Sequence, residues 1–134
     1  MKNIIPHYII VFGIGAFGYG GIEILYRGHT HPTMLFAGGI ALLSLFEISK
    51  HNIPLSIKAI LGGGIITAVE FSFGCVFNLG LGMKIWDYSD KPYNIFGQVC
   101  PSFFFTWVLL SFLGIFLCKK ISKLLSMNNT DSSF

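Results

Sequence analysis

The sequence predicts an all-α fold: a polytopic membrane protein built as a bundle of four transmembrane helices. Hydrophobic residues make up 53% of the 134 residues and charged residues only 11%, whereas a soluble domain carries about 25% charged residues. The mean hydropathy is +0.70, and fourteen Phe contribute to an aromatic share of 16%. Too few charges are present to cover a globule in water, whereas a bilayer accepts an apolar exterior.

Four apolar stretches are long enough to cross the hydrocarbon core, which is about 30 Å thick and needs roughly 20 residues at about 1.5 Å each. They cover residues 4–26, 33–48, 55–78 and 99–118. The first begins like a secretory signal peptide, but it is too long for a typical signal and no small-residue cleavage site follows it. We therefore expect it to be retained. Residues 1–126 then form one transmembrane domain, and the polar segment 127–134 is predicted to be a disordered tail.

The positions of Lys and Arg predict the orientation, because loops rich in these residues stay in the cytoplasm. One side carries six of them: Lys2, Lys50, Lys58, Lys119, Lys120 and Lys123. The other side carries three: Arg27, Lys84 and Lys91. We therefore expect a multi-pass protein of the cytoplasmic membrane with the N- and C-termini in the cytoplasm.

The charged, Cys and His residues also exclude several kinds of site. No run of Lys or Arg is interleaved with aromatic residues, so no nucleic-acid partner is expected. The three Cys form no CxxC pair, His29 and His31 lack a third ligand, and no Walker A sequence occurs. We therefore expect no metal, no cofactor and no ATP hydrolysis by a Walker A site. A disulfide between Cys75 and Cys100 stays an alternative, since both fall near the same membrane face.

Two of the predicted spans carry an acid within a stripe of small residues. In the first span the stripe, at spacings of three and four, is Gly13, Ala16, Gly20, Glu23 and Arg27. In the third it is Gly63, Thr67, Glu70, Gly74 and Asn78. Small residues let helices approach closely in lipid, and a carboxylate that faces lipid costs several kcal/mol. We therefore expect the two stripes to meet, with Glu23 and Glu70 inside the bundle.

The two acids differ in their local partners. Glu23 precedes Arg27 by four residues, which favours an ion pair on one helix face. Glu70 has no partner on its own helix, and it lies about 12 Å from the end of the third span if that helix stays regular. Its candidate partners are the loop after the third span and four side chains: Arg27, His31, Thr67 and Asn78. An ionisable residue inside a membrane is by default a functional candidate, so Glu70 is predicted to bind a proton or cation. The alternative is a neutral acid that holds the helix register.

Four stretches between residues 20 and 100 form a recognisable pattern. They are Gly-Gly-Ile-Glu at 20–23 with Tyr-Arg-Gly-His-Thr-His at 26–31, the segment 34–39, Thr-Ala-Val-Glu-Phe at 67–71, and Trp-Asp-Tyr-Ser at 86–89 followed by Pro92, Asn94, Gly97, Gln98 and Cys100. In them the chain resembles the short members of the bacterial ABC-transporter type IV (CmpB) membrane family, although Pro32 stands where those members usually have Trp. The resemblance implies a small polytopic protein of the bacterial inner membrane. It singles out seven residues: Glu23, Arg27, His31, Glu70, Trp86, Asp87 and Asn94.

These features together predict a small transporter or permease-like protein. In this interpretation Glu70 binds the proton or cation. Glu23 and Arg27 form a gate-like pair, and Asp87 shapes the outer mouth. Four helices enclose little volume, so we expect a homo-oligomer or other membrane subunits as partners, besides the lipid bilayer.

Two other functions compete with transport. The alternative is a structural or accessory membrane protein whose polar cluster stabilises the helix bundle. A third class is a lipid-modifying enzyme that uses Glu70, Asp87 and His31 for acid–base chemistry. Nothing in the sequence resembles an activated nucleophile, so no enzymatic activity is expected.

Overall fold

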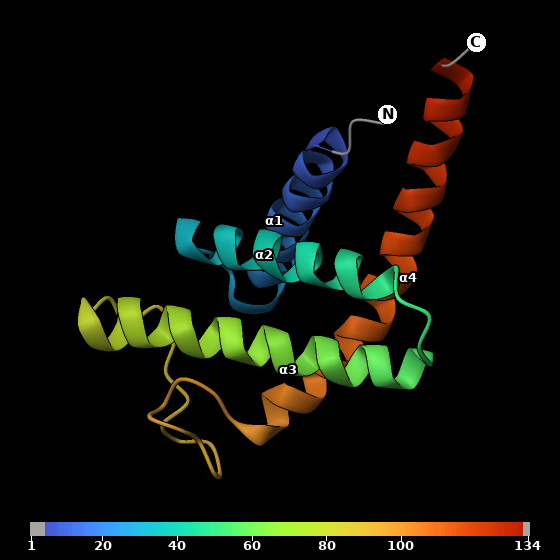
Figure 1. Ribbon diagram of the computed structural model, residues 1–134. Coiled ribbons are helices and arrows are strands. Elements are labelled where there is room, and N and C mark those ends of the chain that lie inside the picture. Colours follow the sequence, from blue (N-terminus) through green and yellow to red (C-terminus); the bar gives the residue numbers. More distant parts are fainter. Residues whose placement is uncertain (1–4, 133–134) are drawn as a thin grey trace.

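The computed structural model describes residues 5–132 and, over that range, confirms the all-α class (Figure 1). The helices are α1 (Ile5–Arg27), α2 (Pro32–Ser49), α3 (Leu55–Phe73), its continuation η1 (Gly74–Gly80) and α4 (Pro101–Ser132). Four helical segments, with α3 and η1 taken together, are long and apolar enough to cross a membrane. The predicted four-span, multi-pass architecture is therefore confirmed.

The turn between α1 and α2 follows from local chemistry. Gly28, with φ of +81°, ends α1 and donates its N–H to the carbonyl of Ile24 at 2.8 Å. Pro32 stands in the first turn of α2, where a missing N–H costs little. His31 caps α2, because its Nδ1 accepts a hydrogen bond from the N–H of Thr33 at 3.2 Å. The short second span is thus well defined at its beginning.

The third span does not stay regular to its end. After Phe73 it continues as a π-helical segment, η1. Such segments are rare in proteins overall, and those that occur are often found at functional sites. The expectation of a regular helix to Asn78 is therefore wrong, and the distance of 12 Å, which assumed that regularity, does not apply. This segment begins at Gly74, where an added Cβ would lie 2.5 Å from Oε1 and 2.9 Å from Cβ of Gln98. The loop after the third span therefore packs closely against the helix at this glycine.

The fourth span is longer than the sequence indicates. Its apolar part is Pro101–Leu125, and the helix itself runs to Ser132. It therefore covers most of the segment 127–134, and the disorder predicted there stays a prediction. Residues 133–134 lie outside the described residues, as does Lys2, which the orientation argument uses.

The helices form two pairs, α1 with α2 and α3 with α4, and α2 also contacts both α3 and α4. In Figure 1, α2 and α3 run side by side in opposite directions, while α1 and α4 cross them. One end of the bundle carries the turn 28–31 and the loop 81–100, and we call it the loop end. The other end carries the loop 50–54, the beginning of α1 and the end of α4, and we call it the basic end.

The predicted contact between the stripes of the first and third spans is wrong. Within the described residues α1 and α3 make no direct helix–helix contact. Gly15 makes the close approach of α1, since an added Cβ would lie 2.6 Å from the carbonyl oxygen of Gly38 in α2, whereas Gly13 has open space around it. In α3, Gly63 packs against Val108 of α4. Small-residue spacing identifies a face that can be approached closely, but not the helix that approaches it.

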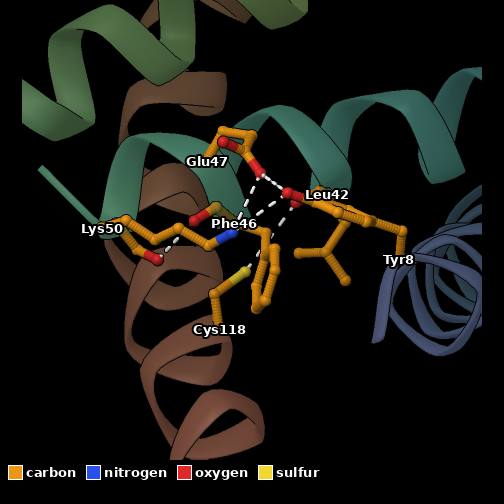
Figure 2. Close-up of polar contacts among 7 residues, drawn as sticks. Tyr8, Leu42, Phe46, Glu47, Lys50 and Cys118 are labelled. Carbon is orange, nitrogen blue, oxygen red and sulfur yellow. Dashed lines mark hydrogen bonds and ion pairs between the residues drawn. The ribbon is translucent and has the colours of Figure 1, made fainter. Parts of the chain in front are cut away.

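An apolar core lies between α1, α2 and α4, toward the basic end. Three of its residues have no exposed surface: Val11, Ile115 and Cys118. The Cys118 thiol points at the carbonyl oxygen of Leu42, with an Sγ–O distance of 3.8 Å (Figure 2). Cys75 and Cys100 are free thiols in the structure, as is Cys118.

Polar contacts tie α1 to α2 at the basic end of this core (Figure 2). The Tyr8 hydroxyl donates to Glu47 Oε1 at 2.5 Å. Lys50 Nζ donates to the same carboxylate oxygen and to the Tyr8 hydroxyl, each at 3.1 Å. These bonds hold the beginning of α1 beside the end of α2.

Candidate functional site

A cavity of about 270 Å³ lies between the helices of the bundle. All four helices line it, together with Trp86 of the loop 81–100. Most of the lining side chains are apolar. The lining also includes one acid, Glu70, and three aromatic residues that carry a polar group: Tyr19, Trp86 and Trp107. A mostly apolar cavity between bundle helices with few polar groups is a common ligand site.

Glu70 is buried, with 6% of its surface exposed. Its Oε2 accepts a hydrogen bond from the Tyr88 hydroxyl at 2.9 Å, and its Oε1 accepts one from the Trp107 indole N–H at 3.2 Å. The loop after the third span thus supplies one partner, as one of the alternatives predicted. Thr67 instead donates to its own helix backbone. Among the described residues, no basic side chain forms an ion pair with Glu70.

The ion pair predicted for the first span is confirmed. Arg27 Nε and Nη2 donate to the two carboxylate oxygens of Glu23 at 2.8 and 2.9 Å. Arg27 Nη1 also donates to the carbonyl oxygen of Ile85 at 3.2 Å, which ties α1 to the loop 81–100. The charge of Glu23 is therefore neutralised by a bidentate ion pair with Arg27, whereas Glu70 accepts hydrogen bonds from uncharged groups only.

Aromatic rings form a continuous row around Glu70. Tyr88 stacks on Phe103 with ring centroids 4.6 Å apart. Phe103 lies 6.1 Å from Trp107, and Trp107 lies 6.0 Å from Tyr19. The face of such a ring attracts a cation within about 6 Å. Of this row, Tyr19 and Trp107 line the cavity together with Glu70. A carboxylate beside aromatic rings is suited to a cation that also has an apolar surface.

Asn78 of η1 holds the loop 81–100 over the cavity. Its Nδ2 donates to the carbonyl oxygen of Trp86 at 3.2 Å and to Oε1 of Gln98 at 2.9 Å. Its Oδ1 accepts from the N–H of Ile85 at 2.6 Å. The Trp86 indole N–H donates in turn to the Gln98 carbonyl at 3.0 Å. The ring of Trp86 is thereby held in the cavity wall.

Replacing Asn78 by Ala should loosen this loop. The change removes three hydrogen bonds and leaves the Ile85 N–H and the buried Gln98 amide without that partner, which we expect to cost about 1–3 kcal/mol. Limited proteolysis in one detergent should then cut the loop 81–100 faster than in wild type. Ser72→Ala is the matched control, because this exposed residue of α3 bonds only to its own helix. Equal cleavage of both variants would show that Asn78 does not hold the loop.

Three of the seven residues predicted for the site lie away from the cavity. His31 caps α2. Asp87 is exposed, and the Ser89 N–H that donates to its Oδ1 at 2.9 Å lowers the pKa of this carboxyl below its usual value. Asn94 Oδ1 accepts from the N–H of Gly97 at 2.9 Å within the same loop. These side chains satisfy backbone groups of turns, and their role in binding stays a prediction.

The structure brings the other four predicted residues together. Glu70 and Trp86 line the cavity. Glu23 and Arg27 are not part of the lining of this cavity. Tyr19, which does line it, interacts with both Glu23 and Glu70, and this links the ion pair to the cavity. The two acids of the first and third spans therefore share one region although their helices do not touch.

Sequence reasoning missed three residues of this region: Tyr19, Tyr88 and Trp107. Each lies in an apolar or interfacial stretch where aromatic residues are common. Burial, followed by the nearby Glu70, raises the pKa of Tyr88 above its usual value, so its hydroxyl stays a hydrogen-bond donor. One property of these residues could have identified them: a buried Tyr or Trp needs a hydrogen-bond partner. Because the spans contain few polar groups, Glu70 was one of the few possible partners.

Comparison with known proteins gives one match. A family model described as "Putative ABC-transporter type IV" matches residues 5–133, nearly the whole chain. The match therefore includes all four helices and the loop 81–100, well beyond the four stretches that first indicated it. No curated protein and no solved structure matches the chain. Within the described part of the chain, no group of three or more His, Cys, Asp or Glu side chains could hold a metal ion.

Proposed function

The chain belongs to the ABC-transporter type IV family, and from this premise we propose that it is a transporter or permease-like protein that binds a cation at Glu70. Family membership and four membrane-long helices support the coarser statement, a transport-associated membrane protein. The observation that carries the finer proposal is the buried Glu70 carboxylate, which lines a cavity and has only uncharged donors.

Charge favours a cation at this place. A carboxylate inside a membrane is costly unless a proton, a cation or a basic side chain neutralises it. Arg27, which was a candidate partner of Glu70, is engaged by Glu23. A proton and a cation therefore compete for Glu70, and we expect cation binding to strengthen as the pH rises.

The lining favours an organic cation over a small inorganic one. Hard inorganic cations such as Ca²⁺ take about six to eight oxygen ligands, whereas this wall offers one carboxylate among apolar and aromatic groups. An organic ammonium group on an apolar body matches both parts of the wall, since rings attract the charge and the apolar side chains cover the rest. We therefore assign the site to a hydrophobic ammonium compound.

The other predicted roles fit around this site as parts of the proposal. The pair of Glu23 and Arg27 joins α1 to the loop 81–100, so breaking it would free that loop to move, as a gate requires. A cavity of about 270 Å³ is too small to be a whole pathway. A second copy or further membrane subunits would complete it. We place the protein in the bacterial cytoplasmic membrane with the basic end in the cytoplasm.

Tryptophan fluorescence can test the cation proposal directly. The chain has two Trp, and both Trp86 and Trp107 line the cavity. We expect benzyltrimethylammonium to change the fluorescence of the detergent-purified protein in a saturable way, and its uncharged isostere neopentylbenzene to bind much more weakly. Equal binding of the two would mean that the cavity is merely apolar, and the cation proposal would fail.

A second function has its own support. The hydrogen bonds of Glu70 join α3 to α4 through Trp107 and to the loop 81–100 through Tyr88. The same cluster would therefore serve a structural or accessory membrane protein by locking the bundle. A Glu70→Gln variant that no longer folds favours this role. A variant that folds but binds no cation favours transport.

A further inference from the structure

A second cavity, of about 290 Å³, lies at the basic end and shares no residue with the cavity at Glu70. The end of α2 and the last turns of the apolar part of α4 line it with Ser49, Lys50, Lys119, Ser122 and Lys123. We propose that this basic pocket binds the phosphate group of an anionic phospholipid. The proposal uses none of the residues at Glu70, so it stands apart from the proposed function.

The positive charge in this pocket exceeds what the protein neutralises. Lys119 and Lys123 are four residues apart on α4, a spacing at which like charges destabilise a helix. Among the side chains of residues 6–125 the ion pairs are Glu23 with Arg27 and Glu47 with Lys50, so neither lysine of α4 takes part in one there. Figure 2 shows that the carboxylate of Glu47 turns toward Tyr8 and Lys50. An external anion between the lysines would relieve their repulsion.

A buried lysine adds to the positive potential behind the pocket. Lys58 has 5% of its surface exposed, and its Nζ donates to the carbonyl oxygen of Ser49 at 3.0 Å. This partner carries no charge, and no acid among the described residues pairs with Lys58. Buried charges are screened less than exposed ones. An anion bound beside Ser49 would therefore be attracted from behind as well as from α4.

The position of the pocket favours a lipid as the source of the phosphate. The apolar part of α2 ends at Ser49 and that of α4 at Leu125, so the pocket lies at the level where lipid head groups meet the helices. Phe112, two turns before Lys119 on the same side of α4, is 36% exposed. An acyl chain would cover this ring while the phosphate reached the lysines. Basic pockets between transmembrane helices are known to take anionic head groups.

Native mass spectrometry of the full chain in detergent can test this pocket. The purified protein is titrated with phosphatidylglycerol and, separately, with phosphatidylcholine of the same acyl chains. We expect wild type to retain one phosphatidylglycerol in preference to phosphatidylcholine. The Lys119→Gln/Lys123→Gln variant should bind phosphatidylglycerol about 25-fold more weakly, at about fivefold for each lysine. The single variants are measured too, so a double variant that fails to fold still leaves a result.

Lys120→Gln is the matched control. It removes the same charge from the same turn of α4, but Lys120 Nζ lies over the Phe116 ring at 5.1 Å and is not part of the pocket lining. We expect it to keep the preference for phosphatidylglycerol. Equal retention of the two lipids by wild type, or an equal loss in Lys120→Gln, would overturn the proposal. Displacement of the lipid by millimolar inorganic phosphate would make the ligand a soluble phosphate and overturn the lipid assignment.

Discussion

Glu70→Gln is expected to weaken the binding of benzyltrimethylammonium by roughly 100-fold while the helix bundle stays folded. The amide has nearly the same shape as the carboxylate and keeps one oxygen that can accept from Tyr88 or Trp107, so the packing around it survives. The variant lacks the negative charge, and an interaction with a charged partner is worth about 1.5–3 kcal/mol. Titration of the fluorescence of the two Trp measures the loss.

Glu47→Gln is the control for this prediction. This substitution also removes one negative charge from a Glu. The carboxylate of Glu47, however, lies at the basic end, where it contacts Tyr8 and Lys50. Cation binding should therefore be unchanged in Glu47→Gln. A folded Glu70→Gln protein that binds the cation as well as wild type does would show that Glu70 is not the binding group. An unfolded one would leave the structural role as the better account.

Gly15→Ala is expected to destabilise the protein strongly, whereas Gly13→Ala should not. An added Cβ at Gly15 would lie 2.6 Å from the carbonyl oxygen of Gly38 and 2.6 Å from the Cβ of Leu42. Backbone cannot move aside as the end of a flexible side chain can, so α1 and α2 must separate. Overpacking of this kind costs about 1–3 kcal/mol, occasionally more.

The two glycines make a matched pair for measurement. Gly13 has no atom within 4 Å of an added Cβ, and Ala is favoured over Gly in a helix by about 0.8–1.0 kcal/mol. Thermal unfolding of both variants in one detergent should lower the melting temperature for Gly15→Ala and leave it unchanged or raise it for Gly13→Ala. Equal melting temperatures would contradict the close contact between α1 and α2.

The small-residue stripes show how far sequence periodicity reaches. In the first span, Gly20 of the stripe does meet α2, at Leu35, but Gly13 meets nothing, and the backbone of α2 is approached by Gly15, which lies outside the stripe. The stripe of the third span likewise meets α4 at Gly63 instead of meeting the first span. Both acids were nevertheless predicted to turn inward, and both are buried at 6% exposure. The cost of an acid in lipid selects a buried position without selecting a neighbour.

The sequence by itself determined the features that depend on local composition and spacing. Apolar length is a property of each stretch, and it yields four spans without any knowledge of their contacts. The ion pair of Glu23 and Arg27 follows from a spacing of four on one helix. The short second span is likewise reproduced as α2.

Only the tertiary structure decided what surrounds Glu70 and the basic pocket. Tyr88 and Trp107 are 18 and 37 residues away from Glu70 in the chain, and no periodicity relates positions on different elements. The lysines of α4 likewise meet Lys50 only because α2 ends beside residues 119–123 of α4. Both sites depend on how the helices cross. That crossing is settled by close packing between side chains far apart in the sequence.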